Sequence, residues 1–259
     1  MGVKDRGNKL VGTVYNSGKF GDYEIIYYGS AEDVLIRFHN TGYVTKSGMQ
    51  RVRNGGVIDK LAPTSYGVGY FGENPLSVCQ VDGKKSKEYV LWQSMMQRCY
   101  SSVRHDASPN YIGCSVSEHF KSFGNFYDWC QSQAGFNLDD WALDKDLLFK
   151  GNTVYSEDNC VFLPSHINTF LTKTSKPNIT GFIGVKYLNK YNKYTAVLFK
   201  NKKALYSKYL SSAEEASDEY VKMKKQHATE LADQHQDNLD ARAYHALINY
   251  DPDRYSRYK

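Results

Sequence analysis

Polar side chains of the types that bind metal ions recur at short intervals in residues 142–172, which read ALDKDLLFKGNTVYSEDNCVFLPSHINTFLT. Asp144 and Lys145 come first, Asn159 follows, and Asn168 comes nine residues later. Carboxylate and amide oxygens are hard ligands that suit Mg²⁺, an ion that keeps several waters and leaves room for phosphate oxygens. The chemistry to consider for this stretch is therefore a metal-assisted reaction at a phosphate.

Two strands and a helix are expected to position these groups. Residues 143–149 are apolar with charged interruptions, residues 150–152 (Lys-Gly-Asn) give a turn signal, and residues 154–163 form a second strand. A helix is expected after Pro164, because proline suits the first helical position. Its apolar stripe consists of Ile167, Phe170 and Leu171.

This order of groups resembles the HNH, or ββα-metal, nuclease family, in the diverged form of phage homing endonucleases. The resemblance implies that Asp144 and Asn168 are the ligands of a Mg²⁺ or Mn²⁺ ion. It also implies that Asn159 holds the turn between the strands and orients the catalytic group. Lys145 then stands where the family has its general-base histidine.

Lys145 departs from the family pattern. A lysine with an unperturbed pKa of about 10.4 is protonated at neutral pH, and only strong burial or a cationic neighbour would change that. Lys145 could instead neutralise the phosphate. Asp146 and His166 are the other candidates for the base, although His166 lies two residues before Asn168 and so points to a different face of the helix.

The residues upstream extend the same resemblance to about residues 88–173. Three motifs are similar to the segment that precedes such nuclease cores: W-x-x-M-x-x-R-C-Y at 92–100, Y-x-G-C-x-V at 111–116 and F-x-x-F-x-x-F-x-x-W at 120–129. Helices are expected at 89–99 and 120–133, with a loop at 101–109. The aromatic residues of the second helix recur at helical spacing, which predicts that they belong to the core.

Three strands and a helix are expected near the C-terminus, at 184–187, 193–199, 203–209 and from Ser211 or Ser212 to about Ala232. The helix start carries two overlapping capping boxes, Ser211 with Glu214 and Ser212 with Glu215. This segment is similar to the APETALA2-type DNA-binding domain that phage homing endonucleases share with plant transcription factors. The resemblance implies that the sheet lies in the major groove of double-stranded DNA.

Charge agrees with this placement. Residues 176–234 carry eleven lysines and six acidic residues, so they hold a surplus of five, and eight of these lysines lie between Lys176 and Lys208 without an acidic residue among them. Such a surface would bind phosphates by counterion release. Because the strands contain no arginine, we expect modest sequence specificity. The candidate DNA contacts are Lys186, Lys190, Lys193, Thr195, Lys202, Lys203 and Lys208. An ordinary solvated lysine-rich face is the alternative.

Short β-prone runs separated by glycine turns dominate the N-terminal part. They occur at 11–15, 23–28, 33–38, 43–45 and 57–60. The pattern is similar to small twisted-barrel modules that precede nuclease-like domains in phage proteins. Arg37, Lys46, Arg51 and Arg53 could touch phosphates there, or could be ordinary solvated charges.

The predicted fold is therefore α+β and built of several modules. We expect a small β-barrel-like unit at 1–78, a linker at 79–87, a central ββα-metal domain at 88–175, a three-stranded antiparallel sheet plus helix at 176–234, and a tail at 235–259. The tail is expected to hold one short helix at 240–250 and has no assigned role.

Composition excludes several classes of protein. Five cysteines without a C-x-x-C motif argue against a disulfide framework, and buried free thiols are favoured over a zinc site built from Cys99, Cys114, Cys160 and His119. No signal-peptide core and no run of about 18 apolar residues occurs. We expect a cytosolic protein, in the host cell if a phage encodes it, with no membrane partner and no small-molecule cofactor.

Three functions remain open at this level. The first is a DNA endonuclease of the HNH class that hydrolyses phosphodiester bonds of duplex DNA. The second is a DNA-binding protein with an inactive nuclease centre, acting as a regulator or a counter-defence factor, which Lys145 favours. The third is a structural or partner-binding phage protein that only reuses these folds.

Overall fold

A computed structural model describes residues 9–73, 76–172, 178–200 and 202–255. Helices mix with several small sheets, and none of the described sheets closes into a barrel, so the α+β class is confirmed. The chain divides into two compact units, residues 1–130 with 154–157, and residues 131–153 with 158–259. In the described segments, no helix has both the length and the apolar character needed to cross a membrane.

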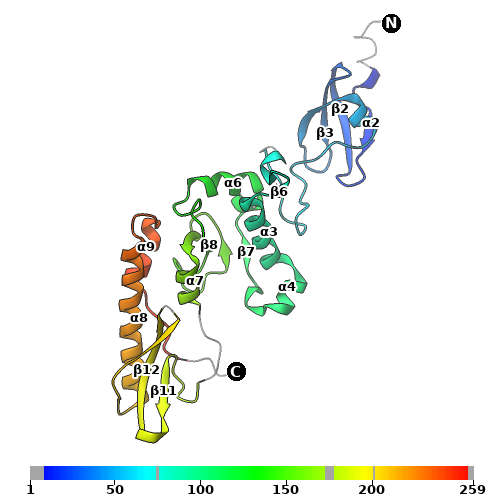
Figure 1. The fold of residues 1–259 in the computed structure, drawn as a ribbon. Coiled ribbons are helices and arrows are strands. Elements are labelled where there is room, and N and C mark those ends of the chain that lie inside the picture. The colour runs from blue at the N-terminus through cyan, green and yellow to red at the C-terminus, as the bar shows by residue number, and fades with distance from the viewer. Residues whose placement is uncertain (1–8, 74–75, 173–177, 201, 256–259) are drawn as a thin grey trace. The chain divides into compact units, whose positions relative to one another are not determined.

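An open antiparallel sheet forms the N-terminal part of the first unit (Figure 1). Its strands, in spatial order, are β1 (Val14–Asn16), β2 (Asp22–Ser30), β3 (Asp33–Phe38) and β4 (Val44–Ser47). Helix α2 (Met49–Arg53) follows β4. The expected barrel-like unit is therefore an open sheet that packs against a helix.

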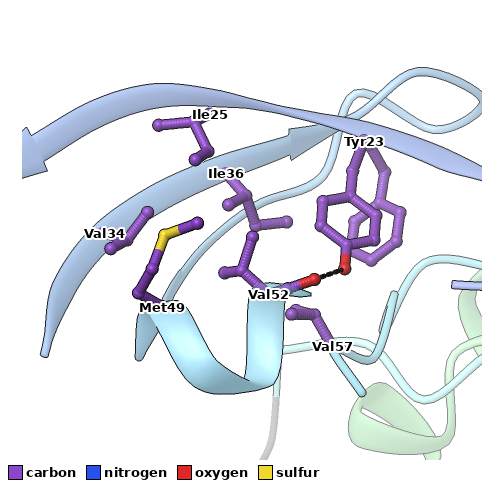
Figure 2. Packing of buried hydrophobic residues seen from close by; sticks show 8 residues of the cluster. Tyr23, Ile25, Val34, Ile36, Met49, Val52 and Val57 are labelled. Atoms are coloured by element: carbon purple, nitrogen blue, oxygen red, sulfur yellow. Dashed lines mark hydrogen bonds between the residues drawn. The ribbon is translucent and has the colours of Figure 1, made fainter. Parts of the chain in front are cut away.

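The core of this part lies between the sheet and α2 (Figure 2). Alternate residues of β2 and β3, such as Ile25 and Ile36, are fully buried, as the period of a half-buried strand requires. Met49 and Val52 of α2 fill the other side. The Tyr23 hydroxyl donates to the Val52 carbonyl at 2.6 Å, so the helix is fastened to the sheet by a buried hydrogen bond.

The strand expected at 57–60 does not form. Asp59 is fully buried, and its carboxylate accepts hydrogen bonds from the Leu61 amide at 2.9 Å and the Thr41 hydroxyl at 2.6 Å. These bonds bend the chain at Asp59 and tie it to the turn before β4. A side chain that bonds to a backbone amide two residues away competes with strand pairing, which explains the failed prediction.

Residues 80–85, expected to belong to a polar linker, form a hairpin of β5 (Gln80–Val81) and β6 (Lys84–Lys85) after the 3₁₀ turn η1 (Leu76–Cys79). Asp82 and Gly83 have φ angles of +51° and +74°. An Asp-Gly pair with two positive φ angles is a favoured two-residue hairpin turn.

The rest of the first unit is largely helical. It contains α3 (Lys87–Tyr100), α4 (Ser102–Ala107), the 3₁₀ turn η2 (Pro109–Tyr111), α5 (Glu118–Lys121) and α6 (Phe123–Ser132). Strand β7 (Ser115–Val116) pairs in parallel with β9 (Val154–Tyr155). Helix α4 replaces the expected loop at 101–109 because the Ser101 hydroxyl caps it, accepting from the Arg104 amide at 3.3 Å.

The helix expected at 120–133 is broken at Ser122, where the chain pairs with Tyr70 instead. The Tyr70 amide donates to the Lys121 carbonyl at 3.0 Å, and the Phe123 amide donates to the Tyr70 carbonyl at 2.8 Å. The aromatic residues nevertheless form the core, as predicted. Those with less than a tenth of their surface exposed are Phe120, Phe123, Phe126 and Trp129. All five cysteines are buried free thiols, also as predicted.

The second unit combines a short hairpin, a three-stranded sheet and two C-terminal helices (Figure 1). The hairpin pairs β8 (Trp141–Asp144) with β10 (Val161–Pro164), and α7 (Ser165–Leu171) follows at once. The sheet consists of β11 (Val185–Leu188), β12 (Lys193–Lys200) and β13 (Lys203–Tyr206), with the 3₁₀ turn η3 (Asn189–Tyr191) after β11. Helices α8 (Ala213–His235) and α9 (Ala241–Ile248) complete it, so the short helix predicted in the tail is confirmed.

Helix α8 packs on both the sheet and the hairpin of this unit. Ala216 is buried near its start, and Tyr220 contacts Ala196 and Leu198 of β12. Leu231 and Ala232 near its end join a core that includes Val161, Leu163 and Ile167 of the hairpin and α7, and Ala243 and Leu247 of α9. The Ser212 hydroxyl caps α8 by accepting from the Glu215 amide at 3.1 Å, which selects the second of the two capping boxes.

Gly184 makes the contact between sheet and helix sensitive to one methyl group. Its φ angle is +70°, and an added Cβ would overlap the ring of Tyr220. Gly151 has a φ angle of +82° with open space around it, so it serves as the matched control. We predict that Gly151→Ala lowers the free energy of unfolding by about 1–2 kcal/mol through backbone strain alone. Gly184→Ala should add about 1–3 kcal/mol of overpacking to that strain, measured by urea unfolding. Equal losses would contradict the packing assigned to Tyr220.

Candidate active site and nucleic-acid interface

The segment keeps the strand–loop–strand–helix order that the sequence predicts, but the single second strand expected at 154–163 is wrong. A turn at 157–159 divides it into β9 and β10. Only β10 pairs with β8, whereas β9 pairs with β7. Asp144 ends β8 opposite Val161 in β10, and Ile167 anchors α7 in the core. The first strand is shorter than expected, because it stops at Asp144 and the chain bends through residues 145–149. Residues 150–151 form the predicted turn.

The carboxylate of Asp144 explains where β8 ends. Its Oδ1 accepts from the backbone amides of Asp146 at 2.9 Å and Leu147 at 2.8 Å, which folds the chain into a turn directly after the strand. The side chain is buried, and this burial raises the pKa of the Asp144 carboxyl, although the two amide bonds oppose the shift. A carboxylate has lone pairs for about four partners, so two amides on Oδ1 leave acceptor capacity for a cation.

Lys145 turns inward beside Asp144 and is 7% exposed. Its ammonium donates to Asp146 Oδ1 at 2.5 Å and to the Asn152 carbonyl at 2.9 Å. An ammonium that donates to a carboxylate acts as a charge partner, and it cannot accept a proton from water while it does so. Through these contacts Lys145 holds the loop and the Asp146 side chain in place.

Asn152 is the centre of the loop between the two strands. Its side-chain amide donates to the Lys145 carbonyl at 2.7 Å, and its Oδ1 accepts from the Asn159 amide at 3.1 Å. Asn159 therefore reaches the Lys145 segment through Asn152. The sequence predicts Asn152 only as a turn residue, and the equal spacing of seven residues to Lys145 and to Asn159 is the signal that could have identified its role.

Asn168 and His166, the predicted site residues on α7, lie in different surroundings. Asn168 is half-buried one residue after the core residue Ile167. His166 is exposed, and its ring lies 5.1 Å from that of His235, centroid to centroid. Among the described residues no recorded contact joins Asn168 or His166 to Asp144, so the metal pair of Asp144 and Asn168 stays a prediction.

No group of three or more His, Cys, Asp or Glu side chains is arranged around a common point within the described segments. The hard oxygens nearest to Asp144 along the chain belong to Asp146, whose side chain is 63% exposed. Oxygen donors of this kind fit Mg²⁺ or Mn²⁺ and are poorly matched to a zinc site of thiolates.

Arg242 of α9 braces the far end of the loop. Its guanidinium donates to the Asp158 carbonyl at 3.0 Å and pairs with Asp240 at 3.0 Å. The tail, which had no assigned role, thus supports the residues that lead into β10. No sequence motif marked Arg242, because the loop carbonyls that it contacts lie more than eighty residues earlier.

The C-terminal sheet presents one face to α8, and its other, open face is exposed at Phe199 and Tyr206 but covered at Thr195. The residues of β12 that face the helix are Ala196 and Leu198, so Lys193, Thr195, Val197 and Phe199 face away. Lys186 is paired with Thr195, so it shares the open face. Lys200 points to the helix side and forms an ion pair with Glu230 at 2.6 Å.

The predicted DNA contacts divide into three groups. Lys186, Lys190, Lys202, Lys203 and Lys208 are exposed. Lys193 is half-buried, with its ammonium 3.3 Å from the Ser211 hydroxyl. Thr195 is 1% exposed, and its hydroxyl donates to the Ser207 carbonyl at 3.1 Å, so Thr195 is removed from the contact set. Lys176 lies outside the described residues.

The N-terminal cations are partly paired. Arg37 donates to Glu24 at 2.5 Å, and Lys46 lies 2.8 Å from Asp33. Arg51 and Arg53 are exposed on α2. Pairing of Arg37 and Lys46 favours the reading of these two residues as solvated strand charges.

We predict that the loop depends on Asn152 more than on Asn159. Asn152→Ala removes two side-chain hydrogen bonds and leaves the buried Lys145 carbonyl without this donor, which should lower the free energy of unfolding by about 1–3 kcal/mol. Asn159→Ala removes one of the same bonds and should have the smaller effect. Urea unfolding of both variants measures the difference. A greater loss for Asn159→Ala would remove Asn152 from the centre of the loop.

Comparison with protein-family models, with curated proteins and with solved structures gave no match. Function is therefore inferred from the residues and contacts of the chain itself.

Proposed function

We propose that the protein is a DNA endonuclease of the ββα-metal type, which hydrolyses phosphodiester bonds of duplex DNA with the help of Mg²⁺ or Mn²⁺. The observation that carries this proposal is the burial of two opposite charges, Asp144 and Lys145, at the end of one strand of the hairpin. Burying charged groups is costly, and a perturbed carboxyl of this kind is more common at functional sites than elsewhere.

In this proposal Asp144 and Asn168 hold the metal ion, which, when bound, polarises the scissile phosphate and stabilises the leaving oxygen. Asn152 and Asn159 keep the loop closed behind Asp144. Lys145 fixes the Asp146 carboxylate, and Asp146 orients the attacking water and accepts its proton. Asp146 is preferred to His166 as the base because it lies two residues from Asp144, whereas the His166 ring lies against His235.

The open face of the C-terminal sheet holds the DNA in this proposal. The exposed lysines would neutralise phosphates and release counterions, so that affinity falls steeply with salt. Acidic residues occur along α8 and are absent from the three strands, and one of them, Glu230, pairs with Lys200 of β12.

We predict that Asp144→Asn abolishes cleavage while the protein stays folded. Asparagine keeps an oxygen that accepts from the amides of Asp146 and Leu147 but removes the charge that a metal needs. The rate of plasmid nicking with Mg²⁺ or Mn²⁺ should fall by more than about 100-fold, beyond the loss that removal of an outer-shell partner causes. Circular dichroism and the thermal midpoint serve as controls for folding.

Two companion variants locate the base. Asp146→Asn should reduce the nicking rate by about 10²-fold or more, and His166→Ala should change it little. Full activity of Asp144→Asn would refute the proposed centre. Loss of activity in His166→Ala with retention in Asp146→Asn would move the base to the helix.

Cleavage should also depend on pH through Asp144. Burial raises its pKa above the ordinary value of an aspartate, so the carboxyl takes up a proton at a higher pH than usual and is then no longer a ligand for the metal. We predict that apparent Mn²⁺ affinity weakens by up to about tenfold for each pH unit below that raised pKa. Titration of Mn²⁺ binding between pH 4.5 and 8 tests this, with Asp144→Asn as the variant that lacks the dependence. A loss of affinity that begins only at the ordinary pKa of an aspartate would contradict it.

A second candidate is a DNA-binding protein without nuclease activity. The ammonium of Lys145, which is bound to Asp146 and the Asn152 carbonyl, favours it, because a lysine in that state is no base. This candidate predicts salt-sensitive binding to duplex DNA and no nicking with either metal. The plasmid assay that tests Asp144→Asn separates the two functions.

A further inference from the structure

The open face of the C-terminal sheet carries large apolar side chains that remain in water. Phe199 of β12 is 68% exposed and Tyr206 of β13 is 57% exposed. In the strand register Phe199 is opposite Ala204 and Tyr206 is opposite Val197, so all four residues share the face that points away from α8. Half of this face, along the β12–β13 hairpin, is therefore apolar.

The other half of the same face is cationic. Lys186 of β11 and Lys193 of β12 lie on it, and no acidic residue occurs in the three strands. An exposed apolar patch next to unopposed lysines matches a partner that has both phosphates and apolar groups. A protein partner would need an acidic surface around an apolar centre, whereas DNA offers this combination at every A·T base pair.

Readout of bases by arginine, asparagine or glutamine is not available from these strands. Their sequences, VKYL, KYTAVLFK and KALY, contain none of these three side chains, and the hydrogen-bonding groups that remain are lysines, tyrosines and the buried Thr195. The apolar group that the major groove displays is the 5-methyl of thymine, and contact with phenylalanine is one way to recognise it. A two-stranded ribbon such as β12–β13 fits this groove.

We propose that Phe199 and Tyr206 recognise thymine methyl groups in the major groove, and that the sheet obtains its sequence preference in this way. The inference rests on the proposed DNA binding by the same face. Phe199 and Tyr206 are diagonal neighbours across the strand pair, which places their Cα atoms about 7–8 Å apart. This separation is close to two base-pair rises of about 3.4 Å each, so the preferred site should contain thymines two steps apart.

The test replaces thymine by deoxyuridine, which removes only the methyl group. Duplexes that bind the full-length protein are first selected from a random pool, and the selected sequences are then synthesised with either base. We expect binding to weaken by about fourfold for each methyl that is lost, and by about fifteenfold for two, measured in a metal-free buffer to prevent cleavage.

Three variants assign the effect to residues. Phe199→Ala and Tyr206→Ala should each bind the thymine duplex more weakly and lose part of the discrimination against deoxyuridine. Lys186→Ala, on the same face, should weaken binding to both duplexes equally and reduce the salt dependence by about one counterion. Because Phe199 and Tyr206 are mostly exposed, the thermal midpoints of the Phe199→Ala and Tyr206→Ala variants should stay near that of the unchanged protein.

The outcomes separate this inference from the proposed function. Equal affinity for thymine and deoxyuridine duplexes, with salt-sensitive binding retained, overturns the methyl recognition and leaves DNA binding in place. Tighter binding to single strands that depends on Phe199 and Tyr206 would mean base stacking, and it overturns the inference too. Failure to bind any DNA at low salt overturns both proposals.

Discussion

The second unit depends on the burial of Asp144 and Lys145 at the end of β8. Neither charge can remain in a mostly dry position without partners, because desolvation would exceed the attraction between them. Asp144 is satisfied by two backbone amides, and Lys145 by Asp146 and the Asn152 carbonyl. The loop between β8 and β10 must therefore adopt this one conformation, since any other conformation would leave a buried charge without its partners.

Helix α8 gives this site a fixed relation to the sheet of the same unit. Its first half packs on β12 through Tyr220, and its second half packs on the hairpin core through Leu231. Between them, the Lys224 ammonium donates to the Phe170 carbonyl at 2.9 Å at the end of α7, and burial lowers the pKa of Lys224. A single rigid helix thus carries both the proposed DNA-binding face and the helix that bears Asn168.

Periodicity made much of the fold predictable, and local side-chain bonds account for most failures. The sheet of β11–β13, the start of α8 and the aromatic core around Phe120 follow from patterns that packing preserves. The missing strand at 57–60 and the early end of β8 do not, because Asp59 and Asp144 each bond to nearby amides. The Asp82-Gly83 turn was readable in principle, but its charged surroundings suggested a linker.

Only those features of the candidate site that depend on the order of residues along the chain were predictable from the sequence. Asp144, Asn159 and the helix with Asn168 appear in the expected sequence, but the bridge between Lys145 and Asn159 is Asn152, whose position depends on the loop closing on itself. This bridge also changes the question that Lys145 raises. A lysine in place of histidine removes a base, yet here its ammonium holds the carboxylate of Asp146 next to Asp144. Under the proposed function, Asp146 would take the place of that histidine as the base. Because a carboxylate is ordinarily a weaker base than an imidazole, we then expect a slow nuclease.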